Sequence, residues 1–292
     1  MTHHAAAANA DGNDEVYEIL RPAEQSLPLV LASPHSGTRY PPDFLQASRL
    51  DDRALRKSED TYVDEIFAQA PALGAPLLRA LFPRAFLDAN REAYELDPAM
   101  FADRLPPWAN TRSPRVAAGL GTIARVVASG EEIYRAKLDL ADAFARIDGF
   151  YHPYHAALSA LIEDTRRRFG FCILLDCHSM PSSSGPPETG GRLHVDFVLG
   201  DCHGSACSPF LIDAADDYLR GLGYRVNRNA PYAGGFTTRH YGQPKTGRHA
   251  LQIEINRALY MHEATYERKP HLEALARQMS DLIALLGTLE PR

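Results

Sequence analysis

Apolar residues occur in short runs along much of the chain, and most of these runs end at polar or turn-forming residues. Short apolar runs bounded by Gly, Pro, Asn or Asp are typical of buried strands. On this pattern we predict strands at residues 29–33, 76–81, 84–88, 171–176, 193–199, 225–227 and 249–256.

Between these runs, apolar positions recur with the helical period. Residues 51–70, 131–148, 209–221 and 270–287 each predict a helix. The segment "DGFYHPYH" should break the second of these, because proline is tolerated only in the first turn of a helix, and a further helix should then run to about residue 168. Alternating strands and helices predict an α/β fold with a mixed, largely parallel sheet flanked by helices.

Composition narrows the class of protein. The chain has 292 residues, of which 45% are hydrophobic, so it can bury a substantial core. We expect one domain over 15–292 after a disordered arm over 1–14.

The net charge of −6, without a long basic cluster, argues against a nucleic-acid partner. No apolar run reaches the roughly 20 residues that span a bilayer, and no secretory leader is evident, so we expect a cytoplasmic protein with no membrane partner. The oligomeric state stays open.

Four cysteines, Cys172, Cys177, Cys202 and Cys207, are present, and none forms a CxxC pair. Structural zinc sites normally use closer pairs, so we interpret these cysteines as small buried side chains.

Two histidines stand where predicted strands end. "PLVLASPHSG" presents His35 and "ILLDCHSMPSSSG" presents His178. Ligands of open α/β sheets bind beyond the carboxyl ends of the strands, so both imidazoles are candidate metal ligands. A catalytic zinc site usually has three protein ligands. The stretch "SEDTYVDEIF" offers carboxylates, with Asp60 and Asp64 on one face of the predicted helix, and we favour Asp60. A solvated acidic helix face is the alternative.

Glu254 lies inside the apolar strand pattern "HALQIEINR", with Leu251, Ile253 and Ile255 directed to the other face. Burial should raise the pKa of this carboxyl, which suits a general base, although an ion pair with Arg257 is the alternative.

Arginines near these segments indicate an anionic substrate, because a guanidinium binds carboxylates in a bidentate manner. The candidates are Arg91, Arg125, Arg239 and Arg257, and His155 in "YHPYH" is a further candidate for substrate binding. For each of them a purely structural role is the alternative.

Six motifs occur in order: "SPHSG", "DTYVDEIF", "FLDANRE", "LDCHSMP", "PYAGGFTTRHYGQP" and "LQIEINR". Together, from about residue 29 to 260, they resemble the N-formylglutamate amidohydrolase family, whose members are similar in fold to zinc carboxypeptidases and aspartoacylase-like deacylases. The resemblance implies hydrolysis of N-formyl-L-glutamate to formate and L-glutamate, a late step of histidine degradation, with a divalent metal, zinc by preference, as cofactor.

The resemblance also implies roles for individual residues. His35 and His178 would bind the metal, Glu254 would activate water, and Arg91 and Arg239 would bind the substrate carboxylates. The carboxypeptidases have a Glu three residues after the first His, where this chain has Thr38. The third ligand must therefore come from elsewhere, and Asp60 is our choice.

Three alternatives stay open: the same chemistry on another N-acyl amino acid or a peptide terminus, a metal-free cysteine hydrolase using Cys177 or Cys202, and a non-catalytic binding protein with this fold. The cysteine hydrolase is disfavoured because each candidate cysteine is followed directly by its histidine, and adjacent residues of a strand point to opposite faces. Such a pair is poorly placed to act as a catalytic dyad.

Overall fold

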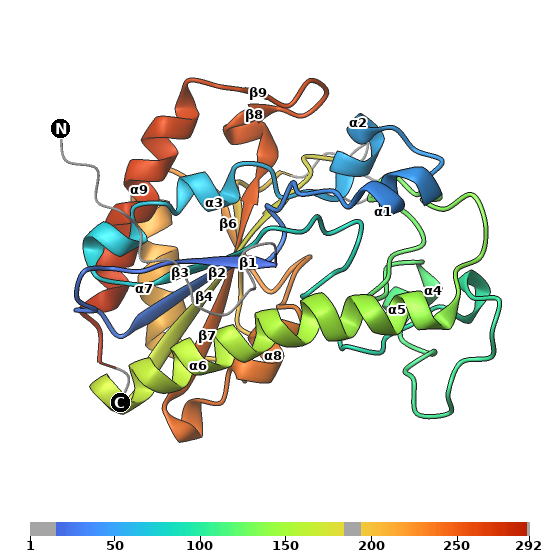
Figure 1. The fold of residues 1–292 in the computed structure, drawn as a ribbon. Coiled ribbons are helices and arrows are strands. Elements are labelled where there is room, and N and C mark those ends of the chain that lie inside the picture. The colour runs from blue at the N-terminus through green and yellow to red at the C-terminus, as the bar shows by residue number, and fades with distance from the viewer. Residues whose placement is uncertain (1–15, 184–193, 291–292) are drawn as a thin grey trace.

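A seven-stranded sheet forms the centre of the molecule in a computed structural model that describes residues 16–183 and 194–290 (Figure 1). The predicted arm over 1–14 lies outside the described residues. The strands follow the order β1-β3-β2-β4-β7-β5-β6. They are β1 (Tyr17–Leu20), β2 (Leu29–Ser33), β3 (Leu77–Ala80), β4 (Cys172–Met180), β5 (Phe197–Gly200), β6 (Val226–Arg228) and β7 (Arg248–Asn256).

The four central strands β3, β2, β4 and β7 run parallel, whereas β1 pairs antiparallel with β3 and β5 antiparallel with β7. The predicted mixed, largely parallel sheet is therefore confirmed. All nine residues of β4 are buried, as expected for a strand covered on both faces.

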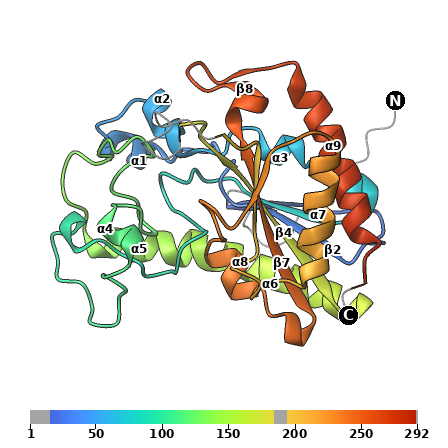
Figure 2. The ribbon, with the colours of Figure 1, turned by 180° about the vertical axis from the view of Figure 1, so that it is seen from behind.

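Helices cover both faces of the sheet. The α-helices of the described residues are α1 (Pro42–Ala47), α2 (Asp52–Leu55), α3 (Val63–Ile66), α4 (Pro114–Ala117), α5 (Leu140–Arg146), α6 (His152–Phe169), α7 (Pro209–Gly221), α8 (Phe236–Tyr241) and α9 (His271–Gly287), and not all of them lie on the sheet. Helix α6 lies on one face, and α7 and α9 lie on the other (Figures 1 and 2). Alternation along β2 explains this arrangement, because Val30 and Ala32 enter the core under α6 while Leu29 and Leu31 enter the core under α7 and α9.

Shorter elements complete the chain. The 3₁₀ turns are η1 (Arg56–Ser58), η2 (Ala70–Leu73), η3 (Pro98–Met100), η6 (Pro244–Thr246) and η7 (Arg257–Leu259), and strands β8 (Met261–His262) and β9 (Glu267–Arg268) form a small hairpin. Among the helices of the described residues, none is both long and apolar enough to cross a membrane.

Most predicted elements are confirmed within a few residues, including the strands that became β2, β3, β4, β6 and β7 and the helices that became α6, α7 and α9. The strand predicted at 193–199 overlaps β5, and its first residue lies outside the described residues. The strand predicted at 84–88 is wrong: the amides of Phe86 and Leu87 bond to the Pro83 carbonyl, so this buried apolar run is a turn. The short edge strand β1 was not predicted.

The helix predicted over 131–148 is also wrong in its extent, because only Leu140–Arg146 of that range forms α5. The predicted break after it is wrong as well. A π turn over Ile147–Tyr151, closed by the bond from the His152 amide to the Ile147 carbonyl, joins α5 directly to α6. The wider turn admits Pro153 near the start of α6, so the chain stays helical.

The segment 51–70 forms three short helical pieces, α2, η1 and α3, instead of one helix. Tyr62 has a left-handed backbone with φ of 66° and separates Asp60 from α3. Its hydroxyl donates to the Tyr266 carbonyl at 2.7 Å, and the Arg268 guanidinium lies 4.6 Å from its ring centroid, so the β8–β9 hairpin holds this turn. Asp60 and Asp64 consequently do not share a helix face: Asp60 points inward, whereas Asp64 pairs with Arg79 at 2.9 Å.

Candidate active site

The carboxyl ends of the parallel strands bring three predicted ligands together. His35 follows β2, His178 lies in β4, and Asp60 lies in the loop before α3. The Asp60 amide donates to the His35 carbonyl at 3.0 Å, which fixes that loop against the end of β2. All three side chains are at most 2% exposed.

Their donor atoms converge on one point. Asp60 Oδ2 lies 3.2 Å from His35 Nδ1 and 3.0 Å from His178 Nδ1. One ligand atom from each residue lies within 4.8 Å of the others, so the cluster could hold a metal ion. Two imidazoles and a carboxylate are ligands that zinc accepts in catalytic sites.

The far nitrogen of each imidazole is held by a second carboxylate. His35 Nε2 lies 2.8 Å from Asp88 Oδ1, and His178 Nε2 lies 2.8 Å from Asp176 Oδ1. Metal-binding histidines commonly bond in this way through their other ring nitrogen, which fixes the tautomer and aims the ligand nitrogen at the metal. The arrangement therefore directs both Nδ1 atoms into the cluster.

Asp60 is itself oriented by neighbours. Its Oδ1 accepts hydrogen bonds from Arg257 Nη2 at 2.9 Å and from Ser179 Oγ at 3.1 Å, which leaves Oδ2 to face the imidazoles. Burial alone would raise the pKa of Asp60, but hydrogen bonds from His178 and His35 and the charge of Arg257 hold it well below its usual value. The carboxylate is therefore ionised, as a metal ligand must be.

Glu254 stands beside this cluster. It pairs laterally with His178 across strands β4 and β7, and the opposite face of β7 carries Leu251, Ile253 and Ile255 into the core, as the sequence predicted. Burial raises the pKa of Glu254 to about 7, while the charges of His178 and Arg84 act in the opposite direction. Such a carboxyl can take up and release a proton near neutral pH.

A chain of polar contacts orients Glu254. Gln252 Nε2 donates to Glu254 Oε1 at 3.1 Å, and the Gly235 amide donates to Gln252 Oε1 at 2.8 Å. A Cβ atom at Gly235 would lie 2.3 Å from the Asn90 side chain, so only glycine fits there. Close approach of this loop to Asn90 thus sets the orientation of Gln252.

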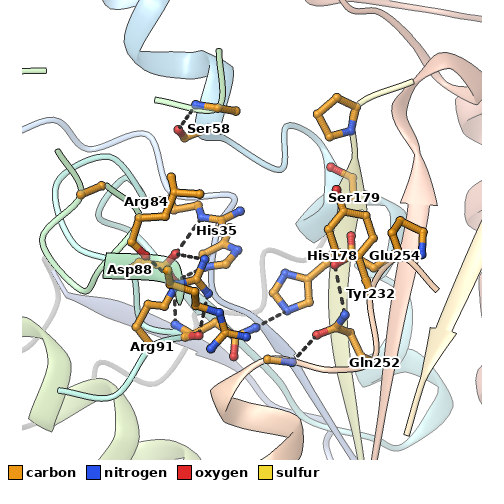
Figure 3. Close-up of a pocket in the computed structure, with 18 of the residues that line it drawn as sticks. His35, Ser58, Arg84, Asp88, Arg91, His178, Ser179, Tyr232, Gln252 and Glu254 are labelled. Atoms are coloured by element: carbon orange, nitrogen blue, oxygen red, sulfur yellow. Dashed lines mark hydrogen bonds and ion pairs between the residues drawn. The ribbon is translucent and has the colours of Figure 1, made fainter. Parts of the chain in front are cut away.

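His35, His178, Gln252 and Glu254 line one cavity of about 460 Å³, shown in Figure 3. Arg84, Asp88 and Arg91 lie on one side of the view, and His178, Ser179 and Glu254 lie on the other. Arg84 Nε donates to Asp88 Oδ2 at 2.9 Å, and Arg91 Nη2 lies 3.4 Å from the same oxygen. Burial lowers the pKa of Arg91 to about 10, whereas the pKa of Arg84 is raised because the charge of Asp88 and other carboxylates outweighs burial. Both guanidiniums are therefore charged at neutral pH.

Of the predicted substrate-binding residues, Arg91 and Arg257 line this cavity. Arg257 is already bound to Asp60, so it is both the structural ion partner and a wall of the site. The ion pair is thus made with Asp60 and not with Glu254.

The structure does not bring the other three candidates into this cavity. Arg125 lines a separate cavity and pairs with Asp97 at 2.8 Å. Arg239, on α8, is half exposed and lies 3.5 Å from Glu92. The ring of His155 bonds to the Tyr241 hydroxyl and the Ala89 carbonyl, and burial lowers its pKa to about 4. His155 is therefore a neutral side chain joining packed elements.

Sequence reasoning missed Asp88, Asp176, Asn90, Gln252 and Arg115, which the site also contains or contacts. Asp176 carried a signal, since it stands two residues before His178 in one strand and must point to the same face. Asp88 lay in a segment that the sequence assigned to a strand, so its approach to His35 was hidden.

The cysteines are free thiols, and Cys172, Cys177 and Cys207 are buried. Burial raises the pKa of Cys177 well above its usual value and also raises that of Cys202. A thiolate nucleophile is disfavoured at both positions.

Fold and site together are those of a hydrolytic enzyme of the α/β class with a candidate metal centre at the edge of its sheet. A family model described as N-formylglutamate amidohydrolase matches residues 27–261. The chain belongs to that family.

Similar proteins agree with this assignment. A protein named N-formylglutamate deformylase from Pseudomonas putida is 28% identical over 240 residues, covering 81% of this chain and 83% of the relative. A second protein of that name, from Pseudomonas aeruginosa, is 28% identical over 84% of this chain and 86% of its own length. A crystal structure of N-formylglutamate amidohydrolase from Ralstonia eutropha JMP134 superposes with a TM-score of 0.85 at 38% identity, covering 92% of this chain and 96% of that one.

Proposed function

We propose that this protein hydrolyses N-formyl-L-glutamate to formate and L-glutamate. The observation that carries the proposal is one cavity lined by His35, His178, the buried Glu254 and four arginines, with Asp60 grouped with the two histidines. The names of the two curated relatives and of the similar solved structure support the same substrate.

The three donors fit a divalent metal, zinc by preference. Two imidazole nitrogens and one ionised carboxylate oxygen converge, and each imidazole is held from behind by a carboxylate. When bound, such a metal supplies positive charge that favours ionisation of water and polarises a carbonyl. His35, Asp60 and His178 would hold it.

The chain's own groups account for the proton transfers. Glu254, with a pKa near neutrality, accepts a proton from the attacking water, whose oxygen forms a bond to the formyl carbon. The carbon–nitrogen bond of the amide then breaks, and Glu254 returns the proton to the leaving nitrogen. The remaining proton of the attacking water, now on the carboxyl group of formic acid, passes to the amine. The products are formate and the ammonium form of glutamate, so atoms and charges balance.

Arg84 and Arg91 are suited to hold the α-carboxylate of the substrate. Both guanidiniums contact Asp88, which in turn bonds to His35, so they lie beside the place where the amide would react. Fixing that carboxylate would hold the amide in one orientation relative to Glu254. Arg125, Arg239 and His155 receive no substrate role in this proposal.

Another N-acyl amino acid is the second candidate substrate, because the apolar lining residues Leu120, Ala124 and Val126 give the cavity a hydrophobic part. Histidine degradation as the pathway and the cytoplasm as the location stay predictions of this proposal.

The test combines elemental analysis with formate release from N-formyl-L-glutamate and from N-acetyl-L-glutamate. We expect about one zinc-like ion per chain, formate release that is lost on chelation and restored by metal, and little turnover of the acetyl compound. Formate release unaffected by chelation in a metal-free sample would contradict the metal-dependent mechanism. Turnover of the acetyl compound alone would contradict the substrate.

A further inference from the structure

The described residues that line the active-site cavity include four arginines, Arg84, Arg91, Arg115 and Arg257. Three have carboxylate partners: Arg257 pairs with Asp60, and Arg84 and Arg91 share Asp88. Arg115 makes no ion pair with any carboxylate in residues 16–183 or 194–290. The wall formed by Arg84, Arg91, Arg115 and Asp88 therefore carries two more positive than negative charges among these groups.

Arg115 is held in a defined place. It lies in the short helix α4, which begins after Ser113, whose hydroxyl accepts the Val116 amide at 3.0 Å. The Leu120 amide donates to the Arg115 carbonyl at 2.8 Å, and the Leu120 carbonyl accepts from Arg91 Nε at 2.8 Å. Arg91 and Arg115 are thus fixed to one loop.

The charge of Arg115 acts on both sides of the cavity. Burial lowers the pKa of Arg91, and the nearby guanidiniums of Arg84 and Arg115 lower it further, against the opposing effect of Asp88. Burial raises the pKa of Cys202, which Arg239 and Arg115 partly oppose, and Cys202 adjoins Gly234 of the cavity wall. Positive charges that lie close together repel one another, and a bound anion relieves this repulsion. The part of the cavity beside Arg91 and Arg115 is therefore suited to bind a carboxylate.

Resting on the proposed function, we propose that Arg115 binds the side-chain carboxylate of the substrate and selects dicarboxylic N-formyl amino acids over those with neutral side chains. Arg84 and Arg91 touch Asp88 and so lie next to the reacting amide, where the α-carboxylate must be. Arg115 forms no ion pair with Asp88 and lines the cavity from α4, on the loop whose Leu120 carbonyl holds Arg91. The side-chain carboxylate of glutamate lies two methylene groups beyond the α-carbon, so it needs a second cationic group in the same cavity, and Arg115 is the lining arginine not paired with a carboxylate of the described residues.

The test compares N-formyl-L-glutamate with N-formyl-L-glutamine, which has the same shape and no side-chain charge, in wild type and Arg115→Gln. Loss of a charge-assisted hydrogen bond should lower kcat/KM for the glutamate compound about 10- to 100-fold, mainly through KM. The glutamine compound should change less than about threefold, and Arg115→Lys should recover part of the preference. Arg112→Gln, an exposed arginine of the same segment that does not line the cavity, should leave both substrates unchanged.

Equal losses on both substrates in Arg115→Gln, or an unchanged preference, would overturn the assignment of Arg115 while leaving the proposed function intact. If the wild type releases no formate from either compound, the proposed function fails, and calorimetric binding of the two compounds decides on Arg115. Preferential binding of the glutamate compound that Arg115→Gln abolishes would then support the site, and equal binding would overturn it.

Discussion

Gln252 donates a hydrogen bond to Glu254 across 3.1 Å, and its own carbonyl is held by the Gly235 amide. The donor favours the ionised carboxyl, whereas burial raises the pKa of Glu254 to about 7. Together these opposing effects keep the proposed base near neutrality.

The pH profile follows from that pKa. A base acts when it is deprotonated, so kcat/KM should fall about tenfold per pH unit below pH 7 and level off above it. Gln252→Leu removes the hydrogen-bond donor to the ionised form of Glu254, so the pKa of Glu254 should rise. The low-pH decline of kcat/KM should then shift to higher pH by about one pH unit. Steady-state rates between pH 5 and 9 measure both. Gln243→Ala replaces an exposed glutamine and should leave the low-pH decline of kcat/KM where it is. A wild-type decline centred near the pKa of a free glutamate would contradict the role of burial.

Replacing the proposed base should separate binding from chemistry. Glu254→Gln keeps the shape and the contact with Gln252 but cannot accept a proton, so kcat should fall about 10²- to 10⁴-fold. Substrate affinity, measured by calorimetry, and metal content should stay near wild type. A comparable loss of affinity would place Glu254 in substrate binding instead.

Asp60 and Asp64 offer a matched pair of variants. Asp60→Asn removes the charge that two imidazoles and Arg257 face, so the metal content and formate release should both be lost. Asp64→Asn breaks only the partly exposed pair with Arg79 and should keep both. Elemental analysis and circular dichroism check the outcome, and full metal content in folded Asp60→Asn would remove it from the ligand set.

The carboxylates behind the imidazoles should tune affinity for the metal. Asp176→Asn weakens the support of His178 Nε2, and we expect metal affinity to fall about 10- to 100-fold. Competition with a chromogenic chelator measures this. Asp164→Asn, on the exposed surface of α6, is the control, and unchanged affinity in Asp176→Asn would show that the contact does not orient the ligand.

The parts of the site that the sequence predicted are those tied to strand ends. His35, His178 and Glu254 follow from apolar runs that end or alternate in register, and the structure places them together. Asp60 was favoured among the four acids of its segment, but the helix predicted to carry it was wrong. The left-handed turn at Tyr62, and not a helix face, directs Asp60 inward. No local pattern reports a positive φ at a tyrosine.

Long-range contacts account for the other differences. Arg125 and His155 have the right chemistry near the right motifs, yet Arg125 pairs with Asp97, and His155, in α6, bonds to Tyr241. Arg115 lay in an irregular stretch where sequence periodicity gives no direction. Its place in the cavity depends on contacts between residues far apart in the chain, such as the bond from Arg91 Nε to the Leu120 carbonyl.

The left-handed turn at Tyr62 gives the β8–β9 hairpin an influence beyond its own surface. A non-glycine residue in this conformation costs about 1–2 kcal/mol, and the contacts from Tyr266 and Arg268 offset that cost. Brief detachment of the hairpin would free Tyr62 to relax, and Asp60, two residues away, would then be the first of the three proposed ligands to loosen. Local opening of this hairpin, well short of global unfolding, would therefore loosen one wall of the candidate metal centre while the sheet stays intact.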